Sequence, residues 1–170
     1  CQKMNRLRPI FRVRLVRKKM DKSKHISSAF DQDLELLNDL MQKLGALACN
    51  QLDRAIEGLA TQNDSILDTI ITGDAALDKI EAEIHEKAIE IIAIRAPRAQ
   101  DLRYVLVSLK IATILERMGD YARNIANRTK VLSELGNENI PGVNIGRMGH
   151  VTLEMVRDVM MSFKHDDAEM

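Results

Sequence analysis

Oxygen-bearing side chains recur at a spacing of four residues in the stretch 95–128. Glu116, Asp120 and Asn124 follow one another there at that interval. Side chains four residues apart lie on the same side of an α-helix, so the three groups would form one polar stripe along it. Gly119 lies between the two acids although glycine costs roughly 1 kcal/mol of helix propensity relative to alanine. This predicts that another backbone or a ligand comes close at Gly119.

A second acidic stripe precedes the first. Asp74, Asp78, Glu81 and His85 are separated by four, three and four residues, which again places them on one side of a helix. If the two helices are antiparallel neighbours, the stripes can face each other, and repulsion between the carboxylates favours a bound cation. Oxygen-rich sites suit Mg, Mn or Fe, and Zn is conceivable. The later helix adds Asp101 near its start.

The alternative is that these acids form ordinary solvated helix faces. A chain with 25 acidic residues produces several pairs at this spacing by chance. The same interval separates Asp31 from Glu35, Asp64 from Asp68, and Glu154 from Asp158. The spacing alone is therefore weak evidence for a metal site.

Catalytic chemistry has little support in the sequence. A ferritin-like di-iron oxidase needs two Glu-x-x-His pairs. The residues three positions before His25, His85, His150 and His165 are Lys22, Ala82, Arg147 and Ser162. No nucleophile elbow, P-loop or paired general acid and base occurs either. We therefore do not expect an enzyme.

Three long helices must position the acidic stripes. Apolar residues recur at steps of three and four over 27–61, 65–94 and 97–135, each typical of an amphipathic helix. Gly73 is expected to loosen or bend the second of these helices. Short connections between such helices favour antiparallel neighbours. The sequence therefore predicts an all-α protein with an antiparallel three-helix bundle over residues 25–135. The inward positions predicted for the first helix are Phe30, Leu34, Leu37, Met41, Leu44, Ala48, Leu52, Ala55 and Leu59.

A linker and a further helix follow the bundle. Residues 136–146 contain three glycines and a proline, which is typical of a linker. Residues 147–170 then place Val151, Met155, Val159 and Phe163 on one apolar helical face. We interpret this segment as the first helix of an incomplete second bundle. Such a face would pack on its own bundle or on another chain.

Charge is distributed unevenly along the chain. The first twenty residues hold eight Lys or Arg and no acid, and we interpret residues 1–24 as a basic leader outside the fold. The alternatives are a nucleic-acid arm, a membrane-surface arm or a transit peptide. The remaining residues carry a net charge of about −8, which argues against nucleic-acid binding. With two cysteines and no apolar run of 18 residues, a cytoplasmic protein is expected.

Four segments of the chain resemble the PhoU family of bacterial phosphate-transport and phosphate-signalling regulators. The specific match joins APRAQDLR to LERMGDYARNIA at a fixed separation on one helix. HISSAFDQDLELL near the start of the bundle and GDAALDKIE in its middle support it. The resemblance covers the first three-helix repeat of the family and the start of the second.

The resemblance implies a metal site on the acidic stripes. The family's acidic motifs fall on Asp74/Asp78 and on Glu116/Asp120, and members can hold multinuclear Fe or Zn there. Asp101 also matches the family, and Glu81 is a weaker candidate. The predicted ligands are Asp74, Asp78, Glu81, Asp101, Glu116 and Asp120.

The resemblance also implies a non-enzymatic, cytoplasmic negative regulator of phosphate-starvation signalling. Its partners would be the sensor histidine kinase and the ATPase of the phosphate ABC transporter, so it would reach the membrane only through partners. A homodimer is the expected assembly. The rival interpretations are a carboxylate-rich metal-storage bundle and a bare scaffold. The arginines of the third helix would pair with neighbouring acids or offer a docking surface to an acidic partner.

Overall fold

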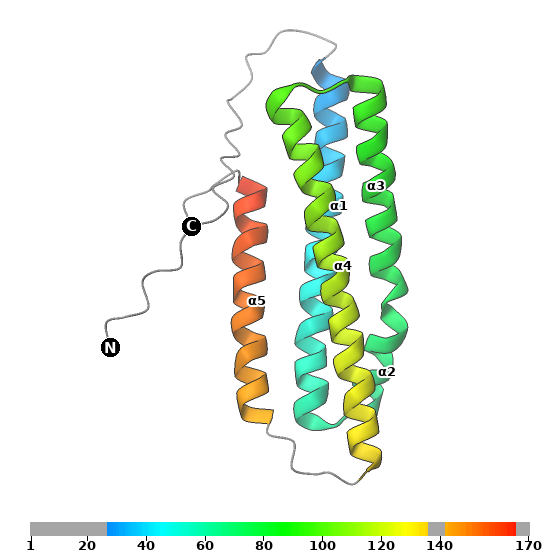
Figure 1. Ribbon diagram of the computed structural model, residues 1–170, viewed down its shortest axis with the longest axis vertical. Coiled ribbons are helices and arrows are strands. Elements are labelled where there is room, and N and C mark those ends of the chain that lie inside the picture. The colour runs from blue at the N-terminus through cyan, green and yellow to red at the C-terminus, as the bar shows by residue number, and fades with distance from the viewer. Residues whose placement is uncertain (1–26, 136–141, 166–170) are drawn as a thin grey trace, which may run out of the picture.

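The described part of the chain is built from α-helices arranged as an elongated bundle (Figure 1). A computed structural model describes residues 27–135 and 142–165, which leaves the basic leader 1–24 outside the described residues. Helices that follow one another run antiparallel, with α2 and α3 continuing in one direction (Figure 1). The helices are α1 (Ser27–Thr61), α2 (Asp64–Gly73), α3 (Ala75–Arg95), α4 (Ala99–Glu134) and α5 (Gly142–His165). This confirms the predicted all-α class.

Helix α1 is the central element, because it contacts each of the other four helices. Its bounds agree with the predicted 27–61. Its inward side chains include Leu37, Met41, Leu44 and Ala48, all fully buried. Phe30 is only partly buried, at the edge of the main core. The four-and-three spacing of large apolar residues thus placed this helix correctly.

The predicted second helix, 65–94, was expected to loosen or bend at Gly73, and the structure divides it there into α2 and α3, at Gly73 and Asp74. The Leu77 N–H donates to the Asp74 carbonyl at 2.9 Å, a tighter three-residue turn. A Cβ on Gly73 would lie 2.8 Å from Nε2 of Gln51, so a side chain of α1 occupies the bend. Asn63 caps the start of α2, because its side-chain oxygen accepts from the backbone N–H of Ser65 at 3.0 Å.

Helix α4 packs against α3 closely enough to need a glycine. A Cβ on Gly119 would lie 2.4 Å from Cδ2 of Leu77, whose side chain is 1% exposed. The expected close approach at Gly119 is therefore made by a leucine side chain of α3 rather than by a backbone or a ligand.

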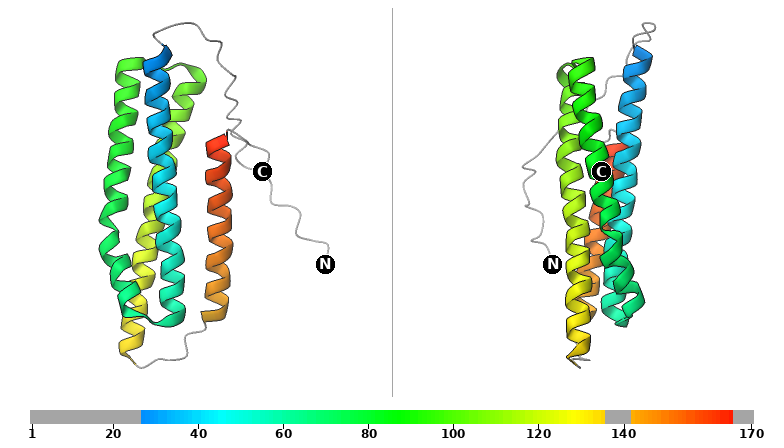
Figure 2. Two further views of the ribbon diagram at one scale, coloured as in Figure 1. Left: turned by 180° about the vertical axis from the view of Figure 1, so that it is seen from behind. Right: turned by 90° about the vertical axis from the view of Figure 1, so that its right-hand side faces the viewer.

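Helix α5 lies along α1 on the side of the bundle away from α3 (Figures 1 and 2). It begins at Gly142, so its first turn falls within the predicted 136–146 linker. Of the predicted apolar face, expected to pack on its own bundle or on another chain, only Phe163 is buried against the bundle: Val151, Met155 and Val159 are 49, 64 and 55% exposed. The buried residues are instead Leu153, Met160 and Phe163.

Glycines explain why α5 turns this way. A Cβ on Gly149 would lie 2.3 Å from Cδ1 of Ile56, and one on Gly45 would lie 2.7 Å from Cε of Met160. Small residues on both helices therefore let the two backbones approach along one line. Phe163 also stacks on Tyr104 of α4, with ring centroids 5.2 Å apart.

An ion-pair network joins α1 to α3. Asp33 accepts from Nζ of Lys87 at 2.6 Å and from Nε of Arg95 at 2.9 Å. The hydrogen bond that Lys87 donates to Asp33 is the main cause that lowers the pKa of Asp33, and the same bond raises the pKa of Lys87. None of the described helices has both the length and the apolar character that crossing a bilayer requires.

Candidate functional site

Four of the predicted ligands gather along the seam between α3 and α4. They are Asp78 and Glu81 on α3 and Glu116 and Asp120 on α4, and we call them the carboxylate seam. The pKa of Glu116 is raised first by burial and then by the negative charges of Asp120, Glu81 and Asp78. These charges act on Glu116 because the four carboxylates lie close together. The two acidic stripes thus face each other, as expected for antiparallel neighbours.

Hydrogen bonds hold part of this seam in place. Oγ1 of Thr113 donates to Oε1 of Glu81 at 2.9 Å, which links α4 to α3. Nε2 of His85 lies 3.5 Å from the same carboxylate oxygen. Glu81 is therefore anchored across the helix pair rather than turned to solvent.

Arg123 pairs with Asp120 of the carboxylate seam and with Asp74 next to it. The guanidinium of Arg123 pairs with the carboxylate of Asp74 and donates to Oδ1 of Asp120 at 2.5 Å. Asp74 is 7% exposed and makes no side-chain cap for α3, because its carboxylate turns across to α4. The arginines of this helix were expected to pair with neighbouring acids, and Arg123 does so both across to α3 and within α4, three residues after Asp120.

Asp101 lies apart from the seam. It is in the first turn of α4, and the fifteen residues between it and Glu116 correspond to about 22 Å of helix. Its backbone N–H donates to the carbonyl of Arg98 at 3.1 Å. The structure therefore brings together five of the six predicted ligands, counting Asp74, and leaves Asp101 at the other end of the helix.

The negative charge of the carboxylate seam favours a bound cation, but the positions of its side chains do not form a set of metal ligands. Burial of Glu116 among three further carboxylates disfavours the fully ionised state, which a cation would relieve. Within residues 27–135 and 142–165, however, no three Asp, Glu, His or Cys side chains converge on a point where a metal ion could sit. Arg123 already balances two of the acids.

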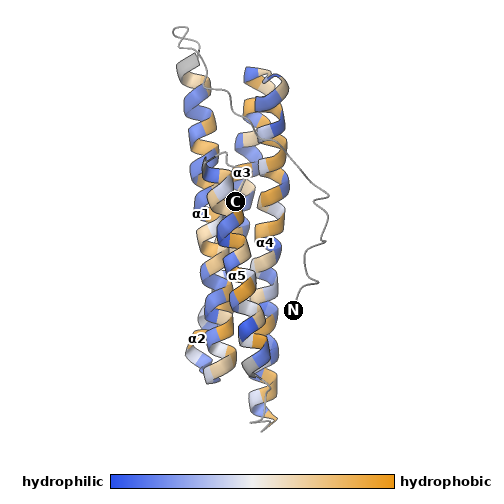
Figure 3. Ribbon diagram, turned by 90° about the vertical axis from the view of Figure 1, so that its left-hand side faces the viewer, coloured by the Kyte–Doolittle hydropathy of each residue, from blue (hydrophilic) through white to orange (hydrophobic). Residues whose placement is uncertain are grey.

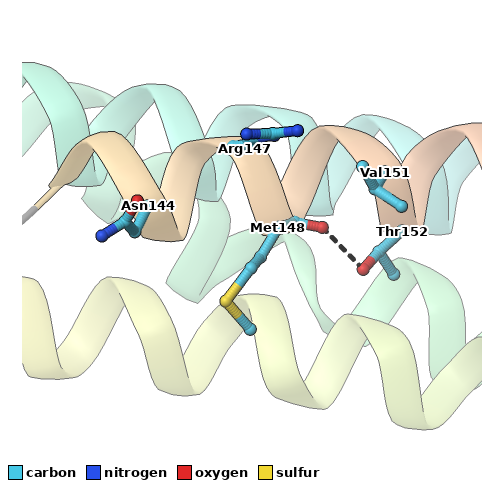
Figure 4. A pocket seen from close by; sticks show the side chains of 5 residues that line it. All are labelled: Asn144, Arg147, Met148, Val151 and Thr152. Carbon is cyan, nitrogen blue, oxygen red and sulfur yellow. Dashed lines mark hydrogen bonds between the residues drawn. The ribbon is translucent and has the colours of Figure 1, made fainter. Parts of the chain in front are cut away.

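Groups suited to covalent catalysis are not poised for it in the described helices. The Cys49 thiol is buried, and burial raises its pKa, so the reactive thiolate is disfavoured. An open hollow of about 490 Å³ lies over α5, lined by Asn144, Arg147, Met148, Val151 and Thr152 (Figure 4). Its lining offers apolar contact rather than an acid and base pair, which is typical of a binding surface.

The comparison with protein families finds the PhoU domain over residues 41–129, from the middle of α1 to near the end of α4. Curated proteins that resemble the chain are named phosphate-specific transport system accessory protein PhoU homolog. One from Zymomonas mobilis is 37% identical over 151 residues, covering 88% of this chain and 63% of that protein. One from Aquifex aeolicus is 38% identical over 136 residues, covering 80% and 61%.

A solved structure resembles the bundle as well. The crystal structure of the phosphate transport system regulatory protein PhoU from Streptococcus pneumoniae superposes with a TM-score of 0.71 at 28% identity. The match covers 78% of this chain and 62% of that one. This chain thus spans slightly less than two thirds of the length of these relatives.

Proposed function

This chain belongs to the PhoU family, and we propose that it is a negative regulator of phosphate uptake and of phosphate-starvation signalling. It would act without catalysis, by docking onto the ATPase of the phosphate ABC transporter and onto the sensor histidine kinase in the cytoplasm. The observation that supports this proposal is the extent of the PhoU domain match, which takes in α2, α3 and most of α1 and α4. The relatives are named as accessory proteins of the phosphate-specific transport system, which supports the proposal further.

The proposed mechanism is conformational. Exposed faces of the helices would serve as docking surfaces, and a cation bound at the carboxylate seam would stiffen the α3–α4 pair. When bound, the cation would supply charge neutralisation. The residues that would hold it are Asp78, Glu81, Glu116 and Asp120, with Asp74 available if Arg123 moves away. Multinuclear Fe or Zn is the proposed occupant, with Mn or Mg conceivable. A metal-storage role is less favoured, because the chain lacks the Glu-x-x-His pairs of ferritin-like sites.

The direct test is a binding measurement on purified proteins. We expect the chain to bind the transporter ATPase, the cytoplasmic part of the kinase, or both, in surface plasmon resonance. The matched control is the ATPase of an unrelated ABC transporter, to which no binding is expected. Binding to neither phosphate-system protein would overturn the proposed function.

We also propose that the chain forms a homodimer through α5. This helix carries a stripe of exposed apolar side chains, 41 to 69% exposed, formed by Ile145, Met148, Met155 and Val159. These residues follow steps of three, seven and four, as in a coiled-coil seam. Large exposed apolar patches mark interaction sites.

Sedimentation of the 170-residue chain tests the α5 stripe. We expect a reversible dimer in the micromolar range, because the stripe spans only about 21 Å of one helix. Met155→Lys should shift the chain to a monomer. Ile89→Lys on α3, where the side chain is 63% exposed, should leave the dimer intact. A parent chain that stays monomeric would contradict the dimer.

A further inference from the structure

Basic residues gather on one face of α4 while its acids lie elsewhere. At about 100° per residue, Arg103, Lys110, Arg117 and Arg128 fall within a sector of roughly 40° of the helix. All four are exposed. The acids of the same helix point to another side: Glu116 and Asp120 join the carboxylate seam with α3. This separation leaves α4 with a purely basic outer face on a body that is otherwise acidic.

Apolar side chains alternate with these basic ones. Leu106 and Ile114 are 51% exposed and Tyr121 is 55% exposed. They lie between the basic residues, so basic and apolar side chains alternate along this face from Arg103 to Arg128. We call this set of seven residues the outer stripe of α4. It extends over about 38 Å of helix, and Figure 3 shows blue and orange segments alternating along α4.

Ion pairing within the described helices does not explain the positions of Arg117 and Arg128. Arg123 and Lys130, also on α4, pair with Asp74 and Asp68 respectively. In the described parts of the chain, Arg117 and Arg128 have no acidic partner within ion-pair distance. Nη2 of Arg117 instead donates to Oη of Tyr121 at 3.1 Å, which fixes an arginine beside an exposed aromatic ring. Arg and Tyr are the residue types that most often dominate binding energy at protein interfaces.

The stripe ends in a hollow. Asn127, Arg128, Val131 and Leu132 line an open depression of about 360 Å³ near the end of α4. Val131 is 55% exposed. An apolar side chain of a partner could seat there beside the guanidinium of Arg128. An apolar anchor next to a charge contributes to the affinity and also fixes the position of the partner along α4.

From these observations we infer that the outer stripe of α4 is a docking surface for an acidic amphipathic helix of a partner protein. The partner would place carboxylates opposite the basic residues and apolar side chains opposite Leu106, Ile114 and Tyr121. A nucleic acid fits less well, because its phosphates would meet the apolar positions and the acidic surroundings. An anionic membrane is disfavoured by the same acidic body. The inference rests on the proposed function, since it names the surface that the phosphate-system partner would use.

The test compares charge-reversed variants in the binding measurement described above. Arg117→Glu with Arg128→Glu should weaken binding to the ATPase or kinase at least 30-fold, and Tyr121→Ala should weaken it about tenfold or more. The matched control is Lys43→Glu with Lys164→Glu, which makes the same change of charge on exposed positions of α1 and α5. The control should alter the affinity less than threefold. Circular dichroism should be unchanged for all variants.

The outcomes separate the two proposals. A parent chain that binds a partner equally well after reversal of Arg117 and Arg128 would overturn the α4 surface while the proposed function stands. A parent chain that binds neither partner would overturn both. Equal weakening by the control pair would show long-range attraction rather than docking, and would also overturn the surface. Binding of duplex DNA or phosphatidylserine vesicles, lost in the α4 variant alone, would replace the acidic helix as occupant.

Discussion

Replacing Gly119 by leucine is expected to lower the free energy of unfolding by about 3 kcal/mol. The α3–α4 contact has no room for a side chain there, because even a Cβ would lie 2.4 Å from the buried side chain of Leu77. The two helices would have to separate, which would also open the carboxylate seam. Chemical denaturation followed by circular dichroism measures the change.

A double-mutant cycle shows whether Leu77 is the cause. Leu77→Ala alone should cost about 3 kcal/mol through the cavity it leaves. The double variant Gly119→Leu with Leu77→Ala should lose less free energy of unfolding than the two single variants lose together. The difference should be at least about 1 kcal/mol, because the leucine at position 119 can occupy the space that Leu77 vacates. Gly146→Leu is the matched control, since nothing lies within 4 Å of a Cβ at Gly146. Equal stability of Gly119→Leu and the parent would refute the close packing.

Removing the charge of Arg123 should both weaken the fold and open the seam to metal. Arg123→Met leaves the buried carboxylate of Asp74 without its partner, which should lower the free energy of unfolding by about 2 kcal/mol in metal-free buffer. Part of the pair faces solvent, so the loss is smaller than for a fully buried pair. Added Zn²⁺ should restore stability, because Asp74 and Asp120 would then be free to bind it.

Thermal melts with and without Zn²⁺, together with elemental analysis, check this prediction. Arg128→Met is the control, because Arg128 is exposed on the same helix and should change neither stability nor metal content. Glu116→Ala with Asp120→Ala should abolish metal retention in the parent background. If Zn²⁺ does not rescue Arg123→Met and metal content is the same in every variant, the seam has a purely structural role.

The positions of α1 and α4 could be predicted because their inward residues recur at steps of three and four, although α4 also buries Ser108 and Thr129. The bend between α2 and α3 could be predicted only as a loosening at Gly73, and not as a division into two helices. Ile70 and Leu77 are seven residues apart and both buried, so the periodicity continues through it. What marks the bend is the contact between Gly73 and Gln51, and this contact joins residues that the sequence pattern does not connect.

The orientation of α5 and the neutralisation of the carboxylate seam also depend on contacts between helices that the sequence pattern does not show. Apolar residues cover a wide arc of α5, and periodicity cannot select between Met155 with Val159 and Leu153 with Met160. Gly45 and Gly149 make the choice by admitting Met160 and Ile56. The acidic stripes were placed correctly, but their partial neutralisation depends on how far Arg123 reaches across the helices.

The central place of α1 has a consequence for how the chain folds during synthesis. As the first of the described helices to leave the ribosome, α1 has its apolar stripe exposed before any of its partners exists. Its contacts with α4 and α5 complete only after Glu134 and His165 have emerged. At roughly 5–20 residues per second this interval lasts several seconds. Nascent α1 is thus the segment most dependent on chaperone protection, and truncation before α4 would leave an aggregation-prone helix.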